Sequence, residues 1–233
     1  MLSFVHYQFL SYVRSLKFIP PLVIFFAWVF ILYAYKGVPI LSSYAVSSIT
    51  MYLIMTWITM SIFTLDDESE KHILITHLRR KRSYLFGKWL TILVIIIPLL
   101  LFAVFFPIIT DSFNKEMSLK LYIFTFYSHL VFAIFGILVG TLFSSTKLAT
   151  KKYAWLSSVL IIVISLASKS IIEMMTFSKW ILWIFPPVFK VVEYMDEDQL
   201  LINKPIIFDS VFVVIYLLIV AVIIIPLFLK KES

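Results

Sequence analysis

Long, nearly uncharged apolar runs dominate this chain and constrain what it can fold into. Hydrophobic residues make up 62% of its 233 positions, charged residues only 14%, and the mean hydropathy is +1.02. Several runs reach the ~20 residues that an α-helix needs to cross a bilayer. They are continuous rather than alternating in polarity, which favours helices over a β-barrel. The sequence therefore predicts an all-α membrane protein, residues 1–233, with one transmembrane domain.

Six transmembrane helices are predicted, separated by loops that hold most of the charges. Their spans are about 18–35, 40–65, 89–109, 121–143, 152–172 and 206–229. The connections at 36–39 and 110–120 are short, whereas 173–205 is long enough to hold structure of its own.

Residues 1–17 precede the first predicted span and look amphipathic. Apolar residues recur there at three- and four-residue steps, at Leu2, Val5, Phe9, Val13 and Leu16. Pro20 and Pro21 are expected to break the helix near the membrane surface. We predict an interfacial helix along one leaflet, with a first span that simply begins early as the alternative. No small-residue cleavage site follows the first span, so no cleavable signal peptide is expected.

The distribution of basic residues predicts the orientation. The N-terminus, the loops at 66–88 and 144–151 with the adjoining Lys152, and the C-terminal tail hold 13 of the 20 Lys and Arg residues. The positive-inside rule places that side in the cytoplasm, so both termini are predicted to be cytoplasmic. The net charge of +7 is attributed to such anchors and not to nucleic-acid binding.

Segment 173–205 would then face outward, and it is rich in aromatic residues. Trp180 and Trp183 precede the pair Pro186-Pro187, and an acidic turn follows. Trp favours the headgroup zone of a bilayer. Two interpretations stay open: a segment that dips into the outer leaflet, and an ordinary interfacial belt.

Motifs for catalysis, cofactors and metals are missing from the sequence. There is no cysteine and no phosphate-binding glycine loop, and the four His residues have no metal-ligand spacing. We expect no catalytic, cofactor-binding or metal site in this chain. His129 is the main ionisable residue inside a predicted span. A hydrogen bond to a neighbouring helix is favoured for it over a polar cavity.

The second predicted span is rich in hydroxyl groups and Met. This pattern suits a helix that lines a translocation path, and it also suits plain helix packing. With the outer Trp residues, it gives candidates for a substrate path: Ser47, Thr50, Met51, Met55, Thr59, Trp180 and Trp183.

Gly136 and Gly140 form a G-x-x-x-G in the fourth predicted span. This spacing lets two helices approach closely. Packing within the chain is favoured over a contact between two copies.

A charged island lies between the second and third predicted spans, from Asp66 to Lys88. Acidic residues come first, at Glu68 and Glu70, and a basic run follows at 79–82. Acids at the start and bases at the end suit the dipole of a short helix. A solvated loop that merely sets the topology is the plainer alternative.

This island and the six-span pattern resemble the permease subunits of type-2 ABC exporters across essentially the whole chain. Glu68-Ser69-Glu70 is similar to the acidic start of that family's loop, 73–78 to its short coupling helix, 79–82 to its basic stretch, and 84–88 to the start of its third span. Residues 135–140 resemble its fourth span, and the aromatic segment resembles its outward-facing hairpin. Lys71-His72 and Arg80-Lys81 depart from the usual Gly-Thr and Pro, which leaves the subfamily open.

The resemblance implies partners and a cargo. A separate ATP-binding subunit would bind ATP and Mg and contact the coupling residues, which are Glu68, Glu70, Ile73, Leu74, His77, Leu78 and Arg79. A second permease subunit, identical or different, would complete the path in the membrane of a bacterial cell. Exporters of phenol-soluble modulins and bacteriocin export or immunity permeases are the nearest resemblances. They imply amphipathic peptides or lipid-like molecules as cargo.

Other functions are also compatible with the sequence. The same family includes exporters of surface polymers and drugs. A membrane sensor or an assembly factor without transport activity is a further alternative. An intramembrane enzyme should show a paired catalytic set within its spans, and none is visible in the sequence.

Overall fold

The computed structural model describes residues 1–148, 150, 152–175, 179–195 and 204–231, and all regular secondary structure in these ranges is helical. The helices are α1 (Leu2–Arg14), α2 (Ile19–Leu32), α3 (Ile40–Phe63), α4 (Glu68–His77), α5 (Lys81–Ile109), α6 (Leu119–Ser145), α7 (Ala154–Met174), α8 (Lys179–Leu182), α9 (Phe189–Val192), the 3₁₀ helix η2 (Glu193–Met195) and α10 (Lys204–Lys231). The all-α prediction is confirmed for this part of the chain.

Five of the helices are long and apolar enough to cross a membrane, namely α3, α5, α6, α7 and α10. The bent pair α1 and α2 counts as a sixth candidate only when the two are taken together. By helix length and hydropathy, the chain is a candidate multi-pass membrane protein with five or six spans.

The first predicted span is shorter than expected. The 14 residues of α2 extend about 21 Å, which is less than the ~30 Å of a hydrocarbon core. A helix before it is confirmed as α1, which meets α2 at an angle of 79°. The prediction that Pro20 and Pro21 break the helix is wrong. Pro20 and Pro21 occupy the first turn of α2, where a missing N–H group removes no intrahelical bond, and the break lies at 15–18.

The third predicted span begins earlier than expected. α5 starts at Lys81, not at 89, and its 29 residues extend about 43 Å. That length exceeds a ~30 Å hydrocarbon core, so its charged first turns need not lie inside it. The ends of α3, α6, α7 and α10 agree with the predicted spans within two residues.

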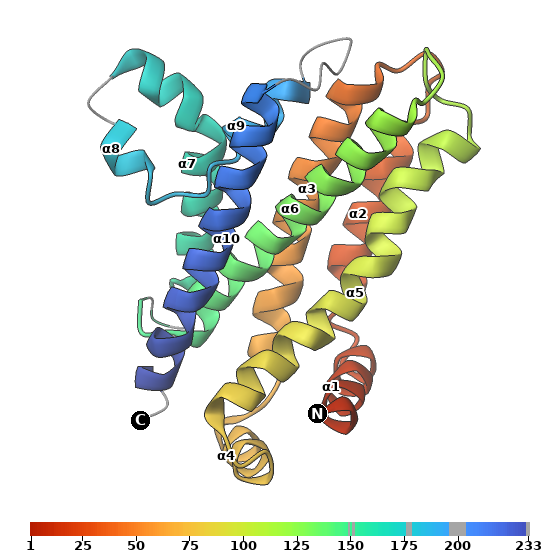
Figure 1. The fold of residues 1–233 in the computed structure, drawn as a ribbon. Coiled ribbons are helices and arrows are strands. Elements are labelled where there is room, and N and C mark those ends of the chain that lie inside the picture. Colours follow the sequence, from red (N-terminus) through yellow and green to blue (C-terminus); the bar gives the residue numbers. More distant parts are fainter. Residues whose placement is uncertain (149, 151, 176–178, 196–203, 232–233) are drawn as a thin grey trace.

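α3 and α6 form the centre of the bundle, where they pack against each other (Figure 1). Their apolar windows are 61% and 72% buried, whereas those of α7 and α10 are 22% buried. The latter two helices therefore keep long apolar faces on the outside, as suits contact with lipid or with another membrane protein.

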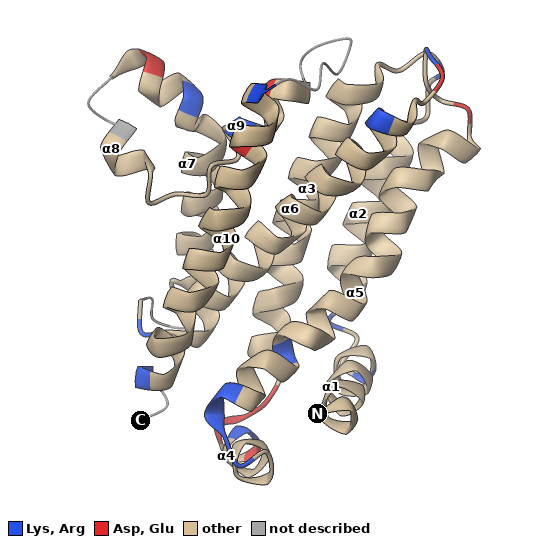
Figure 2. Cartoon of the chain, in the orientation of Figure 1, with Lys and Arg blue, Asp and Glu red and all other residues tan. Residues whose placement is uncertain are grey.

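Both termini lie at the same end of the molecule, together with α1 and α4 (Figure 1). We call this the terminal end. Figure 2 shows Lys and Arg on α1, where α4 connects to α5, and at the last turn of α10. Acidic residues at the terminal end gather around α4. The charged island of the sequence is therefore folded against the ends of several helices.

The segment after α7 turns back along α10 at the opposite end of the molecule (Figure 1). The Trp183 ring lies 6.1 Å from the Phe212 ring, and the Tyr216 hydroxyl donates a 2.6 Å hydrogen bond to the Ile184 carbonyl. Tyr216 is about 18 Å along α10 from its first residue. The described part of 173–205 therefore lies along the first half of α10. Residues 176–178 and 196–203 lie outside the described ranges.

Candidate functional site

A buried ion pair joins Asp66, just after α3, to Lys88 in α5. Lys88 Nζ lies 2.8 Å from Asp66 Oδ2, and the two side chains are 0% and 1% exposed. Removing two charges from water costs several kcal/mol per ion unless other hydrogen bonds complete the site. The surrounding contacts should therefore satisfy both groups.

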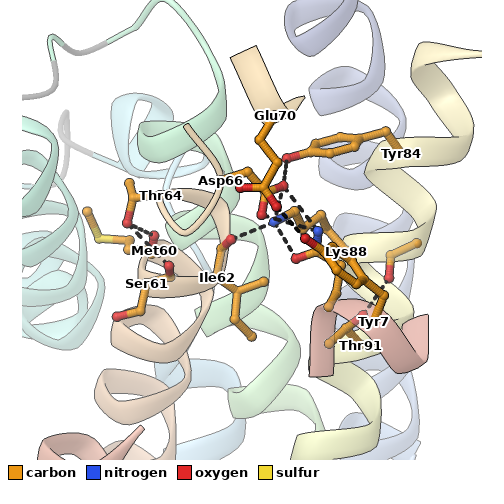
Figure 3. A network of polar contacts seen from close by, with 12 residues as sticks. Tyr7, Met60, Ser61, Ile62, Thr64, Asp66, Glu70, Tyr84, Lys88 and Thr91 are labelled. Carbon is orange, nitrogen blue, oxygen red and sulfur yellow. Dashed lines mark hydrogen bonds and ion pairs between the residues drawn. The ribbon is translucent and has the colours of Figure 1, made fainter. Parts of the chain in front are cut away.

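Every proton of the Lys88 ammonium has a partner (Figure 3). Besides Asp66, Nζ donates to Gln8 Oε1 at 2.7 Å and to the Ile62 carbonyl oxygen at 2.8 Å. Asp66 in turn accepts hydrogen bonds from Tyr84 Oη at 2.6 Å and from Gln8 Nε2 at 3.1 Å. An ammonium has three donors and a carboxylate only acceptors, so this set satisfies the pair.

The network holds four elements together. Gln8 belongs to α1, Ile62 to the last turn of α3, and Tyr84 and Lys88 to α5. α4 joins through Glu70, which accepts a hydrogen bond from the Tyr7 hydroxyl of α1. The pKa of Tyr7 is raised, mainly by this hydrogen bond and to a smaller extent by desolvation of the phenol. The phenol therefore stays protonated and acts as the donor.

Aromatic contacts add the C-terminal helix. The Tyr84 ring stacks on Phe228 of α10 with centroids 6.2 Å apart, and it also packs on Phe4 of α1 at 5.6 Å. The Lys71 ammonium of α4 lies 5.9 Å from the Tyr84 ring and 5.6 Å from the Phe228 ring. We call this whole arrangement the junction: Phe4, Tyr7, Gln8, Asp66, Glu70, Lys71, Tyr84, Lys88 and Phe228.

α4 has one face toward the junction and one away from it. Leu74 and Ile75 are half-buried and pack, with Leu78, against the cluster of Phe4, Tyr84 and Phe228. Outward residues recur at the same helical period, and they are Ser69, His72, Ile73, Thr76 and His77. Ile73 is 69% exposed and lies at the centre of this outward face.

The predicted coupling residues divide between these two faces. Glu68, Ile73, His77 and Arg79 are exposed, whereas Glu70, Leu74 and Leu78 are half-buried against the bundle. The observed helix also begins at Glu68 and ends at His77, not at 73 and 78. Arg79 follows it with φ of 60°, the left-handed conformation that often ends a helix.

The predicted substrate-path residues lie in two separate places. Ser47, Met51, Met55 and Thr59 are fully buried inside the bundle, and Thr50 is half-buried with its hydroxyl bonded to the Val46 carbonyl. Trp180 and Trp183 are 74% and 57% exposed near the opposite end. The structure does not bring the two groups together, and the members in α3 serve helix packing.

The glycines of α6 lie against the backbone of α3. A Cβ added at Gly136 would stand 2.7 Å from the Tyr52 carbonyl oxygen and 2.9 Å from the Thr56 nitrogen. One at Gly140 would stand 2.8 Å from the Thr56 carbonyl oxygen. The G-x-x-x-G therefore packs within the chain in this structure.

His129 is fully buried on α6 and bonded on both ring nitrogens. Nε2 lies 2.8 Å from Ser47 Oγ of α3, and Nδ1 lies 2.9 Å from the Thr125 carbonyl oxygen. The predicted hydrogen bond from His129 to a neighbouring helix is confirmed, and it gives the buried hydroxyl of Ser47 in α3 a partner.

The most connected residues of the junction are not evident from the sequence. Asp66 and Lys88 mark only the two ends of the charged island there, and Gln8 lies outside it. A signal was present: Phe4, Gln8 and Tyr12 recur at four-residue steps, and they form the buried face of α1.

Comparisons with protein-family models, curated proteins and solved structures returned no match.

Proposed function

We propose that this chain is the membrane-spanning permease subunit of an ATP-driven exporter of the type-2 ABC class. The observation that carries the proposal is the position of α4. One of its faces is fixed to the junction, and the other is exposed with Ile73 at its centre. A helix of this kind can receive a force from a soluble partner and pass it to the bundle.

The orientation follows from charge. In the sequence, the N-terminus, the loops at 66–88 and 144–151 with Lys152, and the C-terminal tail carry 13 of the 20 Lys and Arg residues. The positive-inside rule puts the terminal end in the cytoplasm, where ATP is available to a partner subunit. α4 then stands on the cytoplasmic side, with its outward face toward that partner.

The junction supplies the mechanical link. Moving α4 away from the bundle would break the Tyr7–Glu70 hydrogen bond and expose Leu74 and Ile75. Displacing the adjoining loop would also separate Asp66 from Lys88, and breaking a buried pair costs about 3–5 kcal/mol. A push on α4 therefore moves α1, α3, α5 and α10 with it.

The transport path is proposed to form between two permease subunits. The hydroxyl-rich face of α3 is filled by α6 in the single chain, so it offers no open channel there. α7 and α10 keep exposed apolar faces that a second subunit or lipid can cover. Apolar spans of this kind suit amphipathic peptides or lipid-like molecules that enter from the side.

One experiment tests the partner contact. A tagged chain is purified from its own membranes in mild detergent, and Mg²⁺-dependent ATP hydrolysis retained with it is measured. Ile73→Asp should lower the retained activity about tenfold or more, because a charge replaces a central apolar contact. Leu119→Asp is the matched control, since Leu119 is 74% exposed and begins α6 at the opposite end. No retained ATPase, or equal retention by both variants, would contradict the proposal.

A second experiment tests the cargo. Cells that lack this chain should retain amphipathic peptides or lipid-like molecules, or become sensitive to them. Restoring the wild-type chain should restore export, and restoring Ile73→Asp should not. A deletion strain with normal export of such molecules and a clear defect in sodium or proton balance would contradict this cargo.

A further inference from the structure

An apolar pocket lies at the elbow between α1 and α2, where both face α5. It has a volume of about 440 Å³. Phe9 and Tyr12 of α1, Leu22 and Phe26 of α2, and Val94 and Leu99 of α5 are among the residues that line it. The pocket follows α2 from the elbow inward, since Phe26 is about 10 Å along α2 from Ile19. Its shape suits a chain that runs along the span.

Two cations stand at the elbow itself. Arg14 and Lys17 are the neighbours in sequence of the lining residues Val13 and Phe18, and both side chains are exposed. Within the described ranges neither one forms an ion pair. Two acidic groups at the terminal end, Asp66 and Glu70, are bonded within the junction instead. The elbow thus joins an apolar pocket to unpaired positive charge.

We propose that this elbow pocket is a binding site for one anionic phospholipid. An acyl chain fills the space between α1, α2 and α5, and the phosphate lies on Arg14 and Lys17. Bulk lipid tails are as apolar as the pocket, so the apolar contact alone selects no lipid. Selection comes from the headgroup, because a cation close to the membrane surface attracts anionic lipids.

The proposal also explains the exposed stripe of α1. Its buried face is Phe4, Gln8 and Tyr12, whereas Leu2, Val13 and Leu16 of the predicted apolar stripe are 85%, 37% and 59% exposed. A helix lying on the leaflet would keep that stripe in contact with lipid. The site needs only membrane insertion of the chain and is independent of any exporter role.

Photocrosslinking tests the site. The purified full chain is placed in vesicles of phosphatidylglycerol and phosphatidylcholine in equal amounts. One of the two lipids at a time carries a photoactivatable acyl chain, and mass spectrometry maps the adducts. Adducts at the lining residues of α1, α2 and α5 should be about fivefold more frequent with the phosphatidylglycerol probe.

Matched variants separate the two parts of the site. Arg14→Gln with Lys17→Gln should bring the ratio of the two probes close to one, whereas Lys36→Gln with Lys115→Gln should leave it unchanged. Val94→Trp should remove the pocket adducts, and Val163→Trp should not. The two valines are 46% and 55% exposed, so neither change enters a packed core.

Four results would overturn the proposal. One is an equal frequency of pocket adducts from both probes in the wild-type chain. A second is an even spread of adducts over α7 and α10. A third is a loss of adducts in the charge variant that is equal at every position. The fourth is full displacement of the lipid probe by an added amphipathic peptide, which would assign the pocket to cargo.

Discussion

Lys88 behaves very differently from the other basic residues of the charged island. It contributes to the count that sets the orientation, yet its side chain is completely buried and bonded to three groups from α1, α3 and the loop before α4. The exposed Arg79 and Arg80 remain free to act on headgroups or on a partner. The buried Lys88 therefore stabilises the fold, whereas the exposed Arg79 and Arg80 are available for contacts outside the chain.

Replacing Lys88 should destabilise the fold strongly. Lys88→Met leaves Asp66 and Gln8 buried without their donor, and we expect a loss of about 3 kcal/mol in the free energy of unfolding. Denaturant unfolding in detergent measures it. Lys169→Met is the control, because its pair with Glu193 has side chains 48% and 50% exposed and should contribute less than ~1 kcal/mol.

The double variant Lys88→Met with Asp66→Asn separates charge from packing. It should recover part of the loss, since it removes both charges together. Equal stability of Lys88→Met and Lys169→Met would contradict the role given to the buried pair.

At the level of elements, α3 and α6 approach more closely than side chains would allow. Gly136 and Gly140 permit this, because their missing Cβ atoms leave room for the α3 backbone. The same approach brings Ser47 to His129. The central pair of helices is therefore fixed by both shape and hydrogen bonding.

Gly136→Ala should loosen this pair. Its Cβ would meet backbone atoms of α3 within 3.0 Å, and backbone cannot move aside as a flexible side chain can. We expect a loss of about 1–3 kcal/mol, measured as a lower midpoint of thermal unfolding. Leu130→Ala on the same helix is the control, because Leu130 is 42% exposed. A midpoint as high as the control's would show that the helices can move apart at little cost.

The two faces of α4 should also respond differently. Leu74→Asp places a carboxylate against the Phe4, Tyr84 and Phe228 cluster, so it should lower stability by about 2 kcal/mol or more. Ile73→Asp faces outward and should change stability by less than ~0.5 kcal/mol. Both are measured in the isolated chain, which makes the result independent of any partner. The reverse order of the two effects would mean that α4 is turned the other way.

At the level of the whole molecule, the fold places both termini and α4 at one end (Figure 1). The connection at 110–118 lies at the opposite end. This arrangement makes the topology testable with single cysteines, because the chain has none of its own. Ser112 is a poor site, since it is 2% exposed and hydrogen-bonded to the Tyr33 carbonyl, whereas Lys115 is exposed.

Cysteines at Ser3, His72 and Lys115 should report opposite sides. With both termini in the cytoplasm, an impermeant thiol reagent on intact cells should label only Lys115→Cys. Opening the membranes should make all three reactive. Labelling of Ser3→Cys or His72→Cys in intact cells would overturn the orientation and, with it, the proposed contact of α4 with a cytoplasmic ATPase.

The helical type of the chain and the approximate ends of α3, α6, α7 and α10 followed from the sequence alone, whereas the short α2 and the early start of α5 did not. Length, hydropathy and the order of charges act within one segment, so they can be read locally, as for α3, α6 and the acidic start of α4. The tertiary structure decided which groups meet. Gln8, Asp66 and Lys88 are far apart in the chain, and Ser47 meets His129 only because two glycines let α3 and α6 touch. A polar group in a span or beside it carries no local mark of its partner. Its burial is tolerable only once packing supplies that partner, and packing belongs to the whole molecule.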